Sequence, residues 1–248
     1  MTTIAICGCN GKMGRVIAEC AAQREDCTVV AGIDVNTSSR EFPVYGSPFD
    51  MKERPDVVID YSHPSSLERL LDYGKLTGVP LVIATTGFTS KQIEGIRKAA
   101  EQIPVFFTFN MSLGIHLLTE LARKAATVLG DQFDIEIVEK HHSRKVDAPS
   151  GTAIMLADAV AEARGGSMQF TYDRHSCRRP REKSEIGIHS VRGGTIVGEH
   201  DIIFAGHDET ITLSHSAASK DVFAVGSLSA AVFLKGKPSG LYSMADLV

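Results

Sequence analysis

The first 110 residues alternate short apolar runs with longer amphipathic segments, and this alternation restricts the fold more than any other feature. The apolar runs have the length and composition of buried strands, and the segments between them have the apolar spacing of helices. Strands that alternate with helices form a parallel sheet covered by helices on both faces. We expect strands at 3–7, 29–33, 57–60, 81–84 and 105–107, and helices at 12–22, 65–75 and 91–101.

The pattern changes after residue 110, where several strands follow one another with tight turns between them. Gly193-Gly194 and the segment 206–209 are typical of hairpin turns. The fold class is therefore α/β, a Rossmann-like domain with a second α+β domain carrying a mixed, largely antiparallel sheet. We expect helices at 115–129, 153–163 and 222–234, and strands at 133–139, 186–191, 195–204 and 210–216.

Composition excludes several classes of protein. The chain has 248 residues, of which 43% are hydrophobic and 23% charged, and its net charge is −4. These values are ordinary for a soluble globular protein and predict no nucleic-acid-binding surface. No segment resembles a signal peptide or approaches the ~18 apolar residues of a membrane span, so we expect a cytoplasmic protein that does not bind membranes. A local basic cluster is expected to be a solvated loop; it contains Arg174, Arg178, Arg179, Arg181 and Lys183.

The cysteines indicate a reduced protein without a structural zinc site. Their number is odd, their spacing is irregular and no CxxC pair occurs. They are Cys7, Cys9, Cys20, Cys27 and Cys177.

A glycine-rich segment lies exactly between the first expected strand and the first expected helix. Gly8, Gly11 and Gly14 are spaced as GxxGxxG, which departs from the commoner GxGxxG. Glycines at this place allow a tight turn and a close approach to a pyrophosphate, which the free N–H groups of the helix start then bind. The motif alone is also compatible with an ordinary tight turn, but the order of strand, glycine turn and helix favours a dinucleotide.

Asp34 closes the second expected strand, twenty residues after Gly14. An acidic residue there binds the adenine ribose of NAD and repels the 2′-phosphate of NADP. Val35 and Asn36 follow, rather than an arginine, so the sequence favours NADH; an ordinary turn residue is the alternative, and Lys12 could still reach a 2′-phosphate. Segments 84–87 and 108–111 end two further strands at the edge where a nicotinamide should lie.

The segment 136–153, EIVEKHHSRKVDAPSGTA, concentrates chemically active side chains between a strand and a helix. Ser150 or Thr152 can cap the following helix, whose first N–H groups would bind a carboxylate. Lys145 adds positive charge, and His141 and His142 can move protons near neutral pH. A capped helix with incidental basic residues is one alternative; a metal site is another, although no clear third ligand accompanies the histidine pair. The other seven histidines are assigned no role.

These residues carry a strong resemblance to the 4-hydroxy-tetrahydrodipicolinate reductase (dihydrodipicolinate reductase) family. The pattern E-x-x-x-x-H-H-x-x-K-x-D-A-P-S-G-T-A is specific to that family, whereas the glycine turn is not. The resemblance covers essentially the whole chain and includes the segments 85–88, 192–200 and 238–242. It implies NAD(P)H-dependent reduction of a small dicarboxylate in the diaminopimelate and lysine pathway.

The resemblance also implies roles for individual residues. His141 matches the family's acid/base histidine and Lys145 its proton donor. The substrate contacts it implies are Thr86, His142, Lys145, Ser150, Gly151 and Thr152. The cofactor contacts it implies are Gly8, Cys9, Asn10, Gly11, Lys12, Met13, Asp34, Ala84, Thr85, Thr86, Thr108, Phe109, Asn110 and Met111.

The family further implies a homotetramer, with a dinucleotide-binding domain of residues 1–109 and 222–248 and a substrate-binding and oligomerisation domain of residues 110–221. Asn10 and Lys12 depart from the glycine and arginine common in the family's turn, which leaves the cofactor preference open. Another NAD(P) dehydrogenase, a non-catalytic NAD(P) sensor and an interaction module are the alternative functions.

Overall fold

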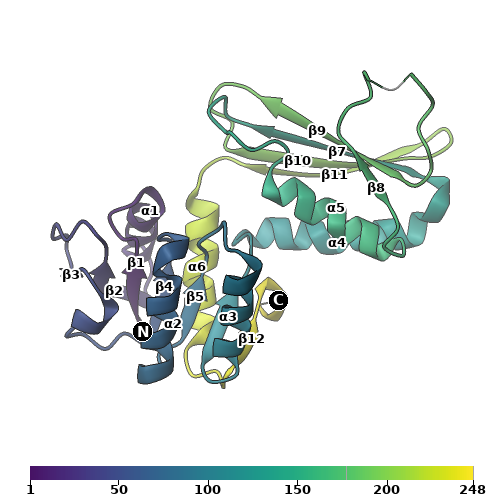
Figure 1. The fold of residues 1–248 in the computed structure, drawn as a ribbon. Helices are drawn as coiled ribbons and strands as arrows, with labels where there is room; N and C mark the ends of the chain where they lie inside the picture. Colours follow the sequence, from purple (N-terminus) through teal and green to yellow (C-terminus); the bar gives the residue numbers. More distant parts are fainter. Residues whose placement is uncertain (177, 248) are drawn as a thin grey trace. The chain divides into compact units, whose positions relative to one another are not determined.

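A computed structural model describes residues 1–176 and 178–247, so Cys177 lies outside the described residues. The described chain forms two compact units, which we treat separately. Unit 1 comprises 1–112 and 220–248, and unit 2 comprises 113–219 (Figure 1). No helix among the described residues is long and apolar enough to cross a membrane.

Unit 1 is built on a seven-stranded sheet in the order β12-β6-β5-β4-β1-β2-β3. All its paired strands run parallel, as the alternation of strands and helices predicts. The strands are β1 (Thr2–Cys7), β2 (Cys27–Ile33), β3 (Val44–Tyr45), β4 (Val57–Asp60), β5 (Leu81–Ile83), β6 (Pro104–Phe107) and β12 (Gly240–Tyr242). The short strands β3 and β12, of two and three residues, were not expected.

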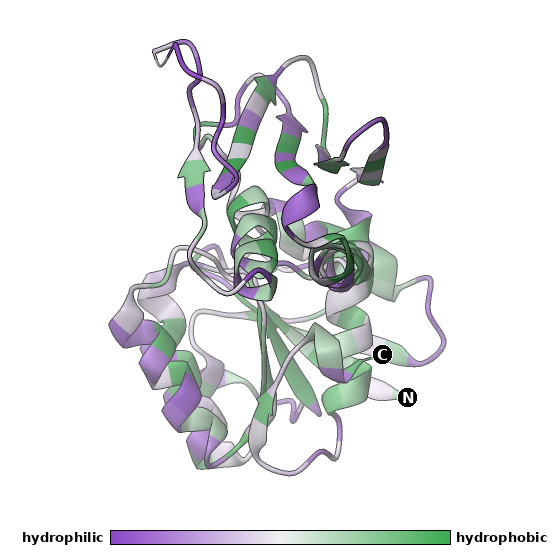
Figure 2. Ribbon diagram, turned by 90° about the vertical axis from the view of Figure 1, so that its right-hand side faces the viewer, coloured by the Kyte–Doolittle hydropathy of each residue, from purple (hydrophilic) through white to green (hydrophobic). Residues whose placement is uncertain are grey.

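Helices cover both faces of this sheet, because each strand is apolar on both sides. Figure 2 shows the hydrophobic strands with helices on either side, and hydrophilic residues on the outer face of the helices at the left. Ile4 and Ile6 face α1 and α6, whereas Ala5 and Cys7 face α2 and α3. The helices are α1 (Lys12–Ala21), α2 (Leu67–Thr77), α3 (Ser90–Ala100) and α6 (Asp221–Leu234), and the short 3-10 helices are η1 (Pro48–Asp50), η2 (Pro64–Ser66) and η4 (Met244–Asp246).

The order of the strands places a crevice at the carboxyl edge of the sheet. From β1 the chain builds β2 and β3 on one side and then returns to build β4, β5 and β6 on the other. Cys7 pairs with both Ile33 and Asp60, so these strands end at the same level. Parallel sheets bind ligands at such a reversal point, outside the carboxyl ends of the strands.

Unit 2 contains a five-stranded mixed sheet in the order β11-β10-β7-β9-β8. Strands β11, β10 and β7 are antiparallel neighbours, whereas β9 runs parallel to both β7 and β8. The strands are β7 (Asp134–His141), β8 (Gln169–Thr171), β9 (Glu185–Arg192), β10 (Gly198–Ala205) and β11 (Thr210–Ala217), and the helices are α4 (Leu113–Leu129), η3 (Gly130–Gln132) and α5 (Gly151–Ala163).

One turn prediction in this unit is wrong. Gly193-Gly194 does not form a hairpin, because β9 and β10 lie on opposite sides of β7 and the segment crosses the end of that strand. At this crossing the Gly193 N–H donates a hydrogen bond to the carbonyl of His141, the last residue of β7 (2.9 Å). The predicted hairpin at 206–209 is confirmed, since it joins the antiparallel strands β10 and β11.

The two faces of the unit 2 sheet differ in what covers them. Ile135 and Ile137 of β7 pack with α4 and α5 in a hydrophobic core. The alternate residues, including Glu136 and Lys140, point to the other face, which carries polar and charged groups. Side chains alternate along a strand, so Glu139 and His141 continue the helix-covered row beyond the hydrophobic core.

Candidate active site

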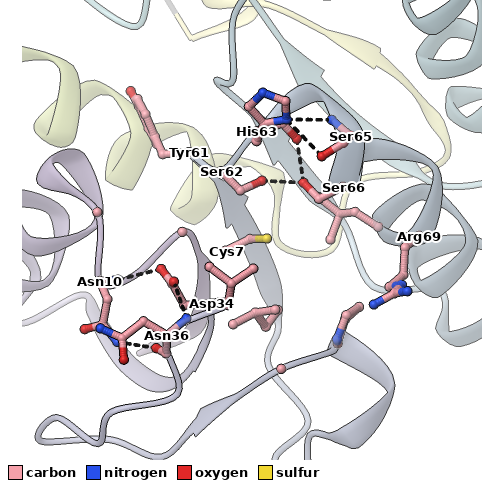
Figure 3. Close-up of a pocket in the computed structure, with 17 residues that line it drawn as sticks. Cys7, Asn10, Asp34, Asn36, Tyr61, Ser62, His63, Ser65, Ser66 and Arg69 are labelled. Carbon is pink, nitrogen blue, oxygen red and sulfur yellow. Dashed lines mark hydrogen bonds between the residues drawn. The ribbon is translucent and has the colours of Figure 1, made fainter.

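A cavity of about 580 Å³ lies in unit 1 at the carboxyl ends of β1, β2 and β4. Figure 3 shows Asn10, Asp34 and Asn36 on one side of it and the segment from Tyr61 to Arg69 on the other. Of the residues predicted to contact a dinucleotide, the cavity is lined by Gly8, Asn10, Gly11 and Asp34. Its position is the reversal point of the sheet, where a dinucleotide is expected.

The glycine turn that borders this cavity leaves no room for side chains. Gly8 has φ +82°, and a Cβ there would lie 2.6 Å from the Tyr61 carbonyl oxygen. A Cβ on Gly14 would lie 2.2 Å from the Gly8 carbonyl oxygen, so this glycine permits the turn to pack against α1. Gly11 is the N-cap of α1 and offers no side-chain cap to the first N–H groups of the helix. The turn therefore fits the pyrophosphate of a dinucleotide.

Asp34 connects the glycine turn to the loop after β2. Its Oδ2 accepts a hydrogen bond from the Asn10 N–H (2.9 Å), and its Oδ1 accepts one from the Asn36 N–H (2.9 Å). The Asn10 side chain in turn donates to the Asn36 carbonyl (2.7 Å). These contacts hold the carboxylate at the edge of the cavity. Each carboxylate oxygen can accept a second hydrogen bond, for example from a ribose hydroxyl.

The other predicted cofactor residues do not line this cavity. Cys9 is fully buried in the core, and Met13 packs against the same core. Lys12 is exposed at the first position of α1. The segments 84–86 and 108–111 follow β5 and β6 at the same edge of the sheet, as expected, but Thr85 and Met111 are themselves buried.

Sequence reasoning missed the side of the cavity formed by the β4–α2 connection. His63 caps η2 through its Nδ1, which accepts from the Ser65 N–H, and Arg69 lies on the first turn of α2. The sequence did contain a signal for this segment, because it directly follows the expected strand at 57–60, whose carboxyl end lies at the same edge of the sheet as the glycine turn. The lining residues of this group are Tyr61, Ser62, His63, Ser65, Ser66 and Arg69.

In unit 2, the chemically active segment connects the end of β7 to the start of α5. Ser150 is the N-cap of α5, and its hydroxyl accepts a hydrogen bond from the Ala153 N–H (3.1 Å). Gly151 and Thr152 therefore occupy the first turn, so the helix begins two residues before the expected start at residue 153, and Ser150, one of the two predicted caps, is the N-cap. Ser150 also contacts Nε2 of the buried His200 (3.1 Å), to which sequence reasoning assigned no role.

A fully buried carboxylate, Glu139, organises this segment. Arg192 donates two hydrogen bonds to it, at 2.6 and 2.8 Å, and His141 Nδ1 lies 2.5 Å from its Oε2. The Ser150 N–H donates to its Oε1 (3.1 Å), and Arg192 also donates to the Asp147 carbonyl (2.7 Å). Sequence reasoning missed Glu139 and Arg192, which only the parallel pairing of β7 and β9 brings together.

The charges around His141 are set by burial and by this cluster. Burial lowers the pKa of His141, and the hydrogen bond and charge of Glu139 act in the opposite direction. Burial and the neighbouring His141 lower the pKa of His200 to about 4, so His200 is neutral near pH 7. Lys145 forms an ion pair with Asp147 at 2.8 Å. No group of three potential metal ligands occurs among the described residues.

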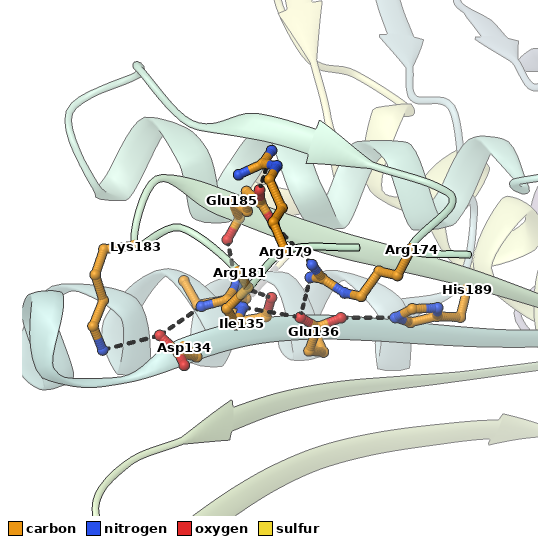
Figure 4. A network of polar contacts seen from close by, with 9 residues as sticks. All are labelled: Asp134, Ile135, Glu136, Arg174, Arg179, Arg181, Lys183, Glu185 and His189. Carbon is orange, nitrogen blue, oxygen red and sulfur yellow. Dashed lines mark hydrogen bonds and ion pairs between the residues drawn. The ribbon is translucent and has the colours of Figure 1, made fainter. Parts of the chain in front are cut away.

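The basic cluster lies in a loop, as expected, with Arg178, Arg179 and Lys183 exposed, and several of its side chains also form ion pairs. Figure 4 shows Arg174, Arg179, Arg181 and Lys183 with their acidic partners, which include Glu136 on the open face of the unit 2 sheet, the face opposite the α4–α5 core. Arg174 contacts Glu136 (2.6 Å) and Glu185 (2.8 Å), and Arg181 contacts Asp134 (2.5 Å). The carboxylates come from β7 and β9, which the sequence pattern alone could not place beside this loop.

Comparison with known proteins agrees with this architecture. The sequence profile of "Dihydrodipicolinate reductase, N-terminus" matches residues 2–111, and that of "Dihydrodipicolinate reductase, C-terminus" matches residues 114–248. A 4-hydroxy-tetrahydrodipicolinate reductase of Caldanaerobacter subterraneus subsp. tengcongensis is 50% identical, covering 100% of this chain and 98% of the relative. One of Clostridium tetani is 46% identical, covering 98% and 96%.

Solved structures include a dipicolinate-bound dihydrodipicolinate reductase from Paenisporosarcina sp. TG-14. It superposes with a TM-score of 0.81 at 28% identity, covering 98% of this chain and 97% of that one. The profiles together span nearly the whole chain, and the similarity to the relatives extends over both units. The chain belongs to the dihydrodipicolinate reductase family.

Proposed function

We propose that this protein reduces 4-hydroxy-tetrahydrodipicolinate to tetrahydrodipicolinate with NAD(P)H, in the diaminopimelate and lysine pathway. The observation that carries the proposal is that one chain holds both a dinucleotide-type cavity and a cluster of Lys145, His141 and a capped helix start. Its relatives, named for this reaction, share up to 50% of its residues over the full length. A protein that only sensed NAD(P) would not need the second cluster.

The dinucleotide would be held by the glycine turn and the start of α1. Gly8 and Gly14 keep the turn free of side chains, and the first N–H groups of α1 would bind the pyrophosphate. Asp34 would accept hydrogen bonds from the adenine ribose, and its charge would repel a 2′-phosphate, so we propose NADH as the preferred cofactor. Arg40, whose guanidinium donates to the Cys9 carbonyl (3.0 Å), and Lys12 keep NADPH usable.

When bound, the reduced nicotinamide supplies the hydride, a chemistry that side chains cannot provide. We propose Ala84, Thr85, Thr86, Thr108, Phe109, Asn110 and Met111 as its remaining contacts. They follow two strands that end at the same edge of the sheet as the cavity.

The substrate carboxylates would bind at the start of α5. Gly151 and Thr152 present the first turn of a 13-residue helix, whose dipole favours a negative charge there. Lys145 and His142 precede this start in the loop, and Ser150 caps the helix. In line with the family resemblance, we also propose Thr86 as a substrate contact. Lys145 would also compensate the second carboxylate, since its ammonium already bonds a carboxylate, Asp147, at 2.8 Å.

The proton that completes the reduction would come from Lys145 or His141. Lys145 carries a transferable proton on an ammonium group near the anion-binding helix start. His141 is mostly neutral near pH 7 because burial lowers its pKa. A neutral imidazole is suited to accepting and passing on a proton, rather than holding one. We further propose a homotetramer and a cytoplasmic location, in line with the family.

A coupled assay tests the reaction. Pyruvate, aspartate semialdehyde and the preceding synthase would generate the labile substrate in place, and oxidation of NADH and NADPH would be followed separately. We expect rapid oxidation that requires the synthase and is faster with NADH. Nucleotide binding without any oxidation would reject the reductase and leave a sensor, and oxidation that needs only the semialdehyde would indicate a different dehydrogenase.

A further inference from the structure

Glu139 uses both carboxylate oxygens inside the protein and exposes none of its side chain to solvent. Oε1 accepts hydrogen bonds from Arg192 (2.6 Å) and from the Ser150 N–H (3.1 Å). Oε2 accepts one from Arg192 (2.8 Å) and lies 2.5 Å from His141 Nδ1. A buried carboxylate so fully satisfied is fixed in orientation, and so are the groups that it binds.

The protonation state of this carboxylate follows from its partners. Burial alone would raise the pKa of Glu139, but the hydrogen bonds from Arg192, Ser190 and His141 outweigh it and lower the pKa to about 2. An ionised carboxylate can only accept hydrogen bonds. His141 must therefore donate through Nδ1, and in the neutral ring the unprotonated nitrogen is Nε2.

We propose that Glu139 is a positioning residue for His141: paired with Arg192, it fixes the imidazole as the Nδ1–H tautomer and leaves Nε2 to exchange protons with the reacting system. This inference rests on the proposed function for its catalytic meaning. It goes beyond the assignment of His141 and Lys145, because neither Glu139 nor Arg192 has been given a part in the chemistry.

The same pair also fixes the substrate-binding segment. Arg192 ends β9 and donates to the Asp147 carbonyl, while Glu139 receives the N–H of Ser150, the cap of α5. A single ion pair thus connects β7, β9 and both ends of the segment 147–150. His141 is faced by Glu139 from its own strand, Arg192 from β9, His200 from β10 and Lys145 from the loop. Of these four groups only Glu139 favours the imidazolium.

The chain offers a matched control in Glu136, on the same strand but on the open face of the sheet. Its Oε1 contacts Arg174 (2.6 Å) and Arg181 (3.3 Å), and its Oε2 contacts His189 Nε2 (2.7 Å), so it too binds arginine and histidine (Figure 4). The substitutions Glu139→Gln and Glu136→Gln therefore each remove a carboxylate charge that contacts arginine and histidine. Only the first concerns a histidine beside the capped helix start.

Nitrogen NMR of protein labelled with ¹⁵N-histidine reads the tautomer directly, with His141→Asn used to assign the signals. In the wild-type protein we expect neutral His141 to carry its proton on Nδ1. In Glu139→Gln we expect that preference to be lost, because the amide can donate to Nδ1, and the His141 pKa to fall because the favourable negative charge is gone. Glu136→Gln should leave both unchanged.

Steady-state kinetics distinguish a positioning role of Glu139 from a purely structural one. Partners that orient a functional histidine typically contribute about 10- to 100-fold. We expect Glu139→Gln to lower kcat by that factor and to move the His141-dependent limb of the pH profile to lower pH. KM should rise as well, because the Glu139–Arg192 pair also holds the segment 147–150. A structural role alone would raise KM and lower stability in both variants, with the tautomer and the pH profile unmoved.

Removing one partner of a buried ion pair leaves the other charge uncompensated, so Glu139→Gln can fail to fold. The double variant Glu139→Gln/Arg192→Gln buries no unpaired charge and gives the same readout. A wild-type His141 that carries its proton on Nε2, or a tautomer that survives either variant, overturns the proposal. Because the tautomer is measured without substrate, failure of the reductase assignment is a separate outcome.

Discussion

The two candidate sites are built in different ways. In unit 1, the turn from Gly8 to Gly14 is defined by space, since side chains at either glycine would collide with backbone atoms. In unit 2, the segment from His141 to Gly151 is defined by charge, since a buried carboxylate and an arginine hold it. We call the first the space-built site and the second the charge-built site. An added side-chain atom should damage the space-built site, whereas a substitution that removes a charge but keeps the side-chain size should damage the charge-built site.

The largest effect is expected from Lys145→Ala, which removes a charge and a proton from the second site. Turnover should fall by about 10²–10⁴-fold, the usual contribution of a proton-transfer group, while NADH binding stays the same. Steady-state kinetics and NADH titration measure the two. Lys140→Ala is the matched control, because Lys140 bonds Glu199 (3.0 Å) and Asp201 (3.2 Å) on the other face of the sheet. Unchanged turnover in Lys145→Ala would remove Lys145 from the mechanism.

Acid should weaken the charge-built site selectively. The pKa of Glu139 is lowered from 4.5 to about 2 in the folded protein. Its contribution to stability is thus complete above pH 4.5 and is lost as the pH falls towards 2, by about 1.4 kcal/mol for each pKa unit of difference. Denaturant unfolding between pH 6 and pH 2 should show this loss in the wild type and in Glu136→Gln, and a smaller one in Glu139→Gln/Arg192→Gln. Identical pH dependence in all three would contradict the buried ion pair.

Bulk should damage the space-built site. In Gly14→Ala the new methyl group would lie 2.2 Å from the Gly8 carbonyl oxygen, so the turn must shift. Overpacking of this kind costs about 1–3 kcal/mol, and we expect the NADH Kd to rise by about tenfold or more. Gly95→Ala in α3 is the control, since its Cβ meets nothing closer than 3.7 Å. Calorimetric titration that finds equal NADH affinity in both would show that the turn does not hold the cofactor.

The smallest effect is expected at Asp34, where charge acts inside the space-built site. Asp34→Asn keeps a similar shape but removes the charge that opposes a 2′-phosphate. The ratio of NADH to NADPH affinity should fall by about tenfold, equivalent to about 1.4 kcal/mol of differential interaction. An equal loss of affinity for both cofactors would mean that Asp34 does not discriminate between them. Its role would then be limited to the hydrogen bonds that it accepts from the Asn10 and Asn36 N–H groups.

The same contrast explains what the sequence could predict. The glycine turn, Asp34 and the strands of unit 1 are local features, and the parallel sheet follows from the alternation of strands and helices. The capped start of α5 is also local, and the structure confirms Ser150, one of the two predicted residues, as the cap. The helices and longer strands are placed to within a few residues for the same reason.

What the sequence could not predict depends on strand order. Glu139 and Arg192 are 53 positions apart, and they meet only because β9 lies parallel to β7. The Gly193-Gly194 turn was misassigned for the same reason, since the adjacent strands along the chain are not neighbours in the sheet. His200 became part of the second site through the antiparallel pairing of β10 with Glu139. Periodicity shows which face a residue occupies, but not which strand lies beside it.

The central claim is that this chain transfers a hydride from its bound cofactor to the dicarboxylate. The most direct test uses NADH deuterated at both C4 positions in the synthase-coupled reaction, with mass spectrometry of the tetrahydrodipicolinate formed. We predict a product one mass unit heavier than the product made with ordinary NADH. An unlabelled product, or cofactor oxidation without any tetrahydrodipicolinate, would contradict the account.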